Sequence, residues 1–338
     1  MRAIISARTV HPLPLTPSTP SPPTPDVLLL VQHPPTYTLG AGSTPAHARF
    51  PLDSPPLPLF YTERGGEITY HGPGQLVVYP ILDLASPPHV RDLHLHLRNL
   101  EEIAIHALRE TSDIVGTRIE SLTGVWVHPP SLNTTSTSMS GSGSGSPSRG
   151  PRATPVDHPG TTLTPSWLQP QKLAAVGVGA KRWVTFHGVA LNVVPNLTPF
   201  GAIVPCGIGD KPVGSVATVL AGSPGFLSTS FPVGGGIGDD PRGTGKADVG
   251  VGRVGVAQVD QASTSSSSWA WPTTTTSAES RLLEEYRWAL RDGAEEVLGV
   301  TLVDWEEAIA DGVSTGIDED LVTQLVDQSV PDPWTSQV

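Results

Sequence analysis

Residues 172–192 read KLAAVGVGAKRWVTFHGVALN, and this stretch decides the fold. Short apolar runs lie at residues 173–177, 183–186 and 189–193, with glycine between or inside them. Such runs predict β-strands, and glycine inside a strand predicts that another segment of backbone passes close by. The stretch is therefore expected to supply strands to a sheet, with another segment of backbone packed closely against them.

The segments on either side alternate between strand and helix patterns. Residues 27–32, 76–84 and 123–127 are apolar runs bounded by Gly and Pro and predict strands. Residues 92–110 and 279–298 carry apolar residues at helical spacing, so each predicts a helix with one face on a sheet. His94 and His96 lie two apart in the first helix, on different sides, and so cannot chelate one metal. The alternation predicts an α/β fold, and we expect no metal site.

Low-complexity composition sets the expected domain boundaries. Residues 1–25 form a Pro-rich leader, compatible with either a transit peptide or a disordered segment. Residues 26–300 are expected to form a single domain, with inserts at about 130–166 and 222–278 that are too rich in Gly, Ser, Thr and Pro to build a core. Residues 301–338 are expected to be an acidic C-terminal tail.

Charge and cysteine content exclude several classes of protein. The formal net charge is −12, but fifteen of the 32 Asp and Glu lie in residues 279–338, and the rest of the chain is neutral. This distribution lacks the basic face that nucleic-acid binding requires. No apolar run approaches the roughly 18 residues that span a bilayer. The single cysteine cannot form an intrachain disulfide, which fits a reducing compartment.

Two glycine-rich segments are candidate ligand sites. Residues 250–255 (GVGRVG) match the dinucleotide fingerprint, but they follow no convincing strand and open no helix, so low complexity explains them better. Residues 64–75 (RGGEITYHGPGQ) place glycines and polar side chains between two strand-like runs. Because such a loop is costly for folding unless backbone must pass close to something, it predicts a binding loop.

Cys206 and Lys172 are the candidate catalytic residues. Cys206 follows an apolar run and stands between proline and glycine, where a sharp turn can present a thiol. By itself a free cysteine is more often a small buried hydrophobe, and an isolated lysine is more often a solvated charge. Each therefore needs support from the surrounding pattern.

That support comes from three segments taken together. RGGEITYHGPGQL from Arg64, KLAAVG from Lys172 followed by HGVALN from His187, and PCGI from Pro205 resemble the signatures of the lipoyl(octanoyl) transferase family. The resemblance covers about residues 27–129 and 167–220. It implies a mixed β-sheet flanked by helices, as in the biotin and lipoate protein ligase catalytic domain. The inserts suggest a eukaryotic, fungal-looking member, and the leader stands where the family has a strand and a helix.

The resemblance also implies a mechanism and a set of site residues. Cys206 carries the acyl thioester, and Lys172 activates it and exchanges protons in both half-reactions. The substrate-binding positions that it implies are Arg64, Gly65, Gly66, Glu67, Ile68, Thr69, Tyr70, His71, Ala175, Val176, Gly177, Gly188, Val189 and Ala190. Backbone N–H groups in the turns around His71 and Gly188 would support the thioester oxygen.

The implied reaction moves an octanoyl group from octanoyl-acyl carrier protein to a lysine of a lipoyl-carrier domain, such as glycine cleavage H protein or a dehydrogenase E2 subunit. It needs no cofactor. The implied location is the mitochondrion. Two alternatives remain open: an ATP-dependent lipoate or biotin protein ligase, and a non-catalytic homologue that binds acyl chains or lipoyl domains.

Overall fold

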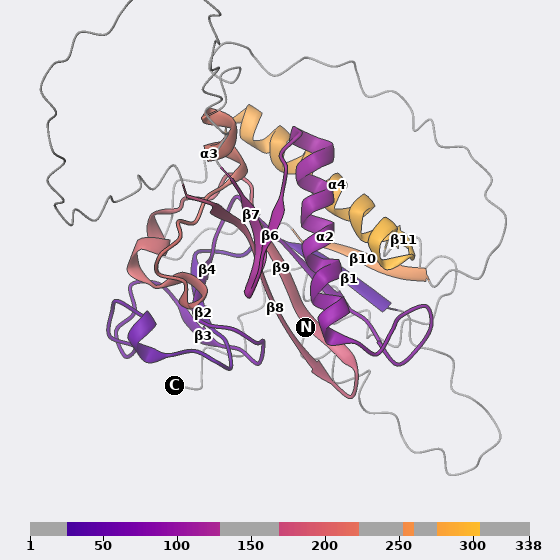
Figure 1. The fold of residues 1–338 in the computed structure, drawn as a ribbon, viewed down its shortest axis with the longest axis horizontal. Coiled ribbons are helices and arrows are strands. Elements are labelled where there is room, and N and C mark those ends of the chain that lie inside the picture. The colour runs from indigo at the N-terminus through magenta and orange to yellow at the C-terminus, as the bar shows by residue number, and fades with distance from the viewer. Residues whose placement is uncertain (1–25, 129–168, 223–252, 260–275, 305–338) are drawn as a thin grey trace, which may run out of the picture.

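A computed structural model of the chain describes residues 26–128, 169–222, 253–259 and 276–304. Its centre is an eight-stranded mixed sheet in the order β11-β10-β1-β5-β9-β8-β7-β6, and a second sheet has the order β3-β2-β4 (Figure 1). The strands of the large sheet are β1 Asp26–Val31, β5 Gln75–Ile81, β6 Thr117–Ile119, β7 Leu122–Val127, β8 Gln171–Lys181, β9 Val184–Asn192, β10 Arg253–Val259 and β11 Thr301–Asp304. The small sheet comprises β2 Thr36–Leu39, β3 Leu59–Tyr61 and β4 Thr69–His71, and the helices are α2 Leu93–Ser112, α3 Val216–Ala221 and α4 Ser277–Leu298. A mixed sheet flanked by helices confirms the predicted fold class.

The hairpin of β8 and β9 forms the middle of the large sheet. The two strands pair without a break from Ala174↔Leu191 to Lys181↔Val184. The apolar runs predicted at 183–186 and 189–193 are therefore one strand, because Gly188 continues the ladder instead of ending it. A Cβ on Gly188 would overlap the carbonyl oxygen of Val78 in β5, which is the close backbone approach that the glycine predicted.

Helices α2 and α4 lie side by side on one face of the large sheet (Figure 1). Asp92 caps α2 by accepting the backbone N–H groups of His94 and Leu95, and a capping box of Thr276 and Glu279 begins α4. Both helices confirm the predicted ranges to within two residues. His96 is buried and His94 is exposed, so the two histidines point to different sides of α2, as the helical spacing required. None of the described helices has the length and apolarity needed to cross a membrane.

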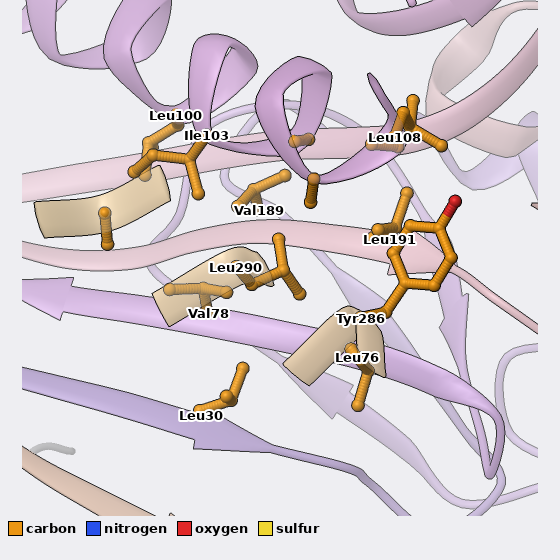
Figure 2. Close-up of a cluster of buried hydrophobic side chains, with 14 of the residues drawn as sticks. Leu30, Leu76, Val78, Leu100, Ile103, Leu108, Val189, Leu191, Tyr286 and Leu290 are labelled. Carbon is orange, nitrogen blue, oxygen red and sulfur yellow. The ribbon is translucent and has the colours of Figure 1, made fainter. Parts of the chain in front are cut away.

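The main core lies between these helices and the sheet. Figure 2 shows side chains of α2 and α4 converging on residues of β1, β5 and β9. The labelled members are Leu30, Leu76, Val78, Leu100, Ile103, Leu108, Val189, Leu191, Tyr286 and Leu290. Helix α4 approaches α2 closely at Gly293, where a Cβ would lie 3.0 Å from Cδ2 of His106. The two helices thus seal one face of the sheet.

Two strands lie where the sequence predicted no core. β10 falls inside the segment 222–278 that was expected to be unable to pack, and β11 lies at the start of the expected acidic tail. β1, β10 and β11 pair in parallel, and α4 forms the crossover between β10 and β11. Parallel strands need such long connections, so the partners of a strand can lie far from it in sequence. A strand within a Gly-rich and Ser-rich segment is then hard to recognise from local sequence alone. The described part of GVGRVG, residues 253–255, begins a strand and opens no helix.

A second, smaller core lies under the three-stranded sheet. β2 pairs with β3 in parallel and with β4 in antiparallel register. The buried members of this core are Tyr37, Leu39, Leu57, Ile68, Tyr70, Phe200 and Ile203. The hydroxyl of Tyr37 donates to the carbonyl oxygen of Pro199 at 2.8 Å, which ties the small sheet to the segment that leads into Cys206.

We expect Leu290→Ala to lower the free energy of unfolding by about 2–5 kcal/mol, because Leu290 is fully buried between α4 and the sheet and its loss leaves a cavity. Urea denaturation measures the change. Trp288→Ala on the same helix is the control, since Trp288 is half exposed and its loss should cost no more than about 1 kcal/mol. Equal losses for both variants would contradict the packing of α4 described above.

Candidate active site

A cavity of about 340 Å³ lies against β5, β8 and β9 of the large sheet and extends to Leu97 of α2. Residues alternate between the two faces of a strand, so Leu76 and Val78 of β5 enter the main core while Val77 and Tyr79 line the cavity. The other walls come from the 64–71 loop and strand, the β6–β7 turn, and the Cys206 segment. The full lining is Arg64, Gly65, Gly66, Glu67, Thr69, His71, Val77, Tyr79, Leu97, Ser121, Leu122, Thr123, Lys172, Ala175, Val176, Gly177, Val178, His187, Gly188, Val189, Ala190, Cys206 and Ile208.

Cys206 occupies a strained turn at the edge of this cavity. It lies in the short 3-10 helix Pro205–Gly207 with φ 56° and ψ 21°, which is the left-handed region that non-glycine residues seldom adopt. Its N–H donates to the carbonyl oxygen of Ile68 at 3.0 Å, so the Cys206 turn is tied to the residue that precedes β4. The thiol is partly exposed. Strain of this kind at a nucleophile is typical of a turn that exists to present a side chain.

Lys172, the second residue of β8, lines the same cavity. Only 6% of the residue is exposed, and its Nζ lies 5.4 Å from the centre of the Trp126 ring, which is a cation–π distance. Within the described ranges, no carboxylate forms an ion pair with this ammonium. Lys172 and Cys206, predicted from separate motifs, are therefore brought to one cavity, and an ammonium beside a thiol stabilises the thiolate.

Arg64 is the structural centre of the loop. Its Nη1 donates to the carbonyl oxygens of Gly65 and Glu67 at 3.1 and 3.0 Å. Its Nη2 donates to the carbonyl oxygen and hydroxyl of Thr38 at 2.9 and 2.8 Å. Burial lowers the pKa of Arg64, and the negative charge of a Cys206 thiolate opposes that change. Arg64 therefore holds the loop and places a second positive charge within electrostatic reach of Cys206.

The rest of the predicted binding stretch divides by strand alternation. Thr69 and His71 line the cavity, whereas Ile68 and Tyr70 point into the small core and do not line it. For Ile68 and Tyr70 the expectation of substrate contact is thus corrected. The Glu67 carboxylate lines the cavity, but it also accepts the N–H and hydroxyl of Thr44 at 2.7 and 2.9 Å. The remaining predicted positions, on β8 and β9, all line the cavity.

Behind His71 and Tyr79, which line the cavity, lies a network of polar side chains, of which the sequence analysis identified only His71 as a site residue. Nε2 of His33 lies 2.7 Å from the Tyr79 hydroxyl, and Nδ1 of His71 lies 2.7 Å from Oε1 of Gln75. Gln75 continues the network by donating to Asn192 at 2.9 Å. Burial lowers the pKa of His33 to about 4 and that of His71 to about 3. Both rings are therefore neutral near pH 7. The sequence signal that could have identified Tyr79 is the alternation of residues along β5, which places Tyr79 on the same face as Val77.

Known proteins resemble this chain over the part that contains the cavity. The sequence profile described as the lipoyl protein ligase A/B catalytic domain matches residues 15–226. The chain belongs to this family. The matched range contains Lys172, Cys206 and every other residue that lines the cavity.

Curated octanoyltransferases are similar to more than half of this chain. An octanoyltransferase of Synechococcus elongatus is 44% identical over 192 residues, which is 57% of this chain and 64% of the relative. A chloroplastic octanoyltransferase of Arabidopsis thaliana is 40% identical over 195 residues, which is 58% of this chain and 54% of the relative. This chain thus spans less than two thirds of the length of these relatives. Among solved structures, a lipoate-protein ligase A bound with ATP is 14% identical with a TM-score of 0.42, covering 90% of this chain and 82% of that one.

We expect the protein to lose stability as the pH falls from about 6.5 to about 5. The buried histidines have folded pKa values below the unfolded value of 6.5, so in this window the unfolded chain binds protons that the folded protein cannot. Each such histidine should lower the free energy of unfolding by about 1 kcal/mol per pH unit. Urea denaturation at the two ends of the window measures this slope.

The matched variants for this test are His33→Gln and Val115→Thr. His33→Gln should make the pH slope shallower, whereas Val115→Thr, at a position 74% exposed, should leave it unchanged. A His33→Gln protein with the original slope would show that His33 is protonated alike in both states.

Proposed function

We propose that this chain transfers an octanoyl group from the thioester of a carrier protein, through a thioester on Cys206, to a lysine of a lipoyl-carrier domain. The proposal is based on one observation: Lys172 and the left-handed turn of Cys206, 34 residues apart in sequence, line one cavity. Relatives that are 40–44% identical and named octanoyltransferases support it.

In the first half-reaction, the thiolate of Cys206 attacks the carbonyl carbon of the octanoyl thioester. Negative charge develops on the thioester oxygen, and the pantetheine sulfur then leaves as a thiol after taking a proton from the Lys172 ammonium. The N–H groups of Cys206 and Gly207 already donate to the carbonyl oxygens of Ile68 and Val204. Support for the oxygen would therefore come from the positive charges of Lys172 and Arg64 more than from the Cys206 turn itself.

In the second half-reaction, the neutral amine of Lys172 takes a proton from the ammonium of the acceptor lysine. The resulting amine attacks the Cys206 thioester, an amide forms, the Cys206 thiolate is released, and the second proton that the nitrogen loses passes to solvent. The ammonium of Lys172 is regenerated, so each cycle releases one proton overall. Thioester exchange is nearly balanced and amide formation is downhill, so the scheme requires no ATP.

The cavity suits a medium-length hydrocarbon chain. Its volume is at the small end of the range of about 300–1,000 Å³ for ligand pockets. The side chains of Val77 and Leu97 offer apolar surface, and the glycines of β8 and β9 remove bulk from the wall. The neutral His33–Tyr79 pair adds no full charge that a hydrocarbon would have to desolvate.

The decisive measurement is a covalent adduct. Octanoyl-acyl carrier protein should add the mass of one octanoyl group to the wild-type chain in intact-protein mass spectrometry, because Cys206 is its only cysteine. Cys206→Ser should form no thioester adduct, and Lys172→Met should slow its formation by about 100-fold or more through loss of general acid–base catalysis. An unmodified wild-type protein would overturn the proposal.

Two rival functions predict different results in the same assay. An ATP-dependent lipoate or biotin protein ligase would modify the acceptor domain only with ATP, and Cys206→Ala would remain active. A non-catalytic homologue that binds acyl chains would retain octanoyl ligand without a covalent bond. The strained turn at Cys206 favours the transferase over both, since neither rival needs a presented thiol.

The mitochondrial location implied by the resemblance stays a prediction. We expect a fluorescent fusion at the C-terminus of the full chain to colocalise with a mitochondrial marker, because lipoyl-carrier domains of dehydrogenases and of glycine cleavage are the proposed acceptors. A fusion found in plastids or throughout the cytosol would contradict it. Residues 1–25, the candidate leader, lie outside the described residues.

A further inference from the structure

The position of the Lys172 ammonium depends on a neighbouring backbone segment. A lysine has a long flexible stem, and among the described residues no carboxylate fixes its charge. Its end rests instead on Gly124 of β7: a Cβ there would lie 2.5 Å from Cε of Lys172 and 3.2 Å from Nζ. The absence of a side chain at Gly124 thus leaves the space that the end of Lys172 occupies.

Gly124 is held in a conformation that the ladder alone does not impose. Its φ is +119°, and the pairing of β7 with β8 shifts register between Val125 and Trp126, just beyond it. Irregular backbone of this kind needs a partner outside the ladder. The N–H of Gly124 donates to Oε1 of Glu101 at 2.9 Å.

Glu101 is itself fixed from its other side. The side chain of Glu101, which lies on α2, is 1% exposed. Its Oε2 accepts hydrogen bonds from Nη1 of Arg98 at 2.7 Å and from Nε of Arg118 at 3.0 Å. Arg118 also donates to Glu102 at 2.5 Å and to the carbonyl oxygen of Arg98 at 3.2 Å. A buried ion pair is weak evidence for a role in stability alone, because desolvation offsets much of the attraction.

We infer that Glu101 is a positioning residue for Lys172: it fixes the Gly124 peptide on which the lysine rests, and thereby the place of the ammonium relative to Cys206. The inference rests on the proposed function in that Lys172 acts on Cys206. The same contacts hold the turn of Ser121, Leu122 and Thr123, which lines the cavity beside Lys172. Glu101 contacts neither substrate nor thiol and acts only through the lysine.

A double-mutant cycle on thiol reactivity tests the inference without any octanoyl donor. Alkylation of Cys206 by iodoacetamide near neutral pH is measured for Glu101→Met in the wild-type and Lys172→Met backgrounds. Glu101→Met should slow alkylation by about tenfold or more in the first background, as misplaced catalytic groups do, and should have no further effect in the second. Glu102→Met is the matched control: it also removes a partner of Arg118 but does not touch Gly124, and it should change the rate less than about twofold.

Equal slowing by Glu101→Met in both backgrounds overturns the inference, as does equal slowing by Glu102→Met or a Lys172→Met protein that is alkylated as fast as the wild type. If Glu101→Met does not fold, Arg118→Met serves instead, because it leaves Glu101 paired with Arg98 and should slow alkylation to an intermediate extent, only when Lys172 is present. In the acyl-transfer assay, Glu101→Met should lower kcat with little change in KM. Absence of coupling together with a normal octanoyl adduct overturns this inference alone, whereas coupling without any adduct overturns only the proposed function.

Discussion

The close approach of the 64–66 loop to the bare surface of the β8–β9 hairpin is the constraint on which the site depends. Gly177 and Gly188 stand opposite each other in the ladder, so the sheet carries no side chains at that level. The N–H of Gly65 can therefore donate to the carbonyl oxygen of Val178 at 2.8 Å, and a Cβ on Gly177 would lie only 3.1 Å from the carbonyl oxygen of Gly65. Arg64 then bridges this loop to β2, and Ile68, the residue before β4, accepts the backbone N–H of Cys206. The small sheet, the loop and the Cys206 turn are thus positioned from one patch of exposed backbone.

Much of this arrangement could be predicted from the sequence because its signals are local. Apolar runs gave the strands around β1, β5, β7, β8 and β9, and helical spacing gave α2 and α4. Glycine inside the apolar runs indicated close approach, and Gly188 against Val78 is such an approach. The match of three separated motifs to one family predicted that Lys172 and Cys206 act together, and the structure brings both to one cavity.

What the sequence could not supply depends on pairing and on alternation. β10 lies far in sequence from its partner β1, and nothing local distinguishes it from its Gly-rich surroundings. Ile68 and Tyr70 belong to a motif that was predicted as a whole to bind substrate, yet an extended segment presents only every second residue to the cavity. The interaction of Glu101 with Gly124 joins an ordinary helix residue to an ordinary strand residue, and no periodicity marks it.

The left-handed turn at Cys206 also bears on how this protein can change. A glycine at that position would adopt the same backbone angles without the steric cost of about 1 kcal/mol that a side chain incurs there. The backbone conformation therefore favours glycine at position 206, whereas the proposed chemistry requires cysteine there. Selection for thermal robustness alone would favour loss of the thiol, and the acyl transfer proposed for this chain is the reason to retain it.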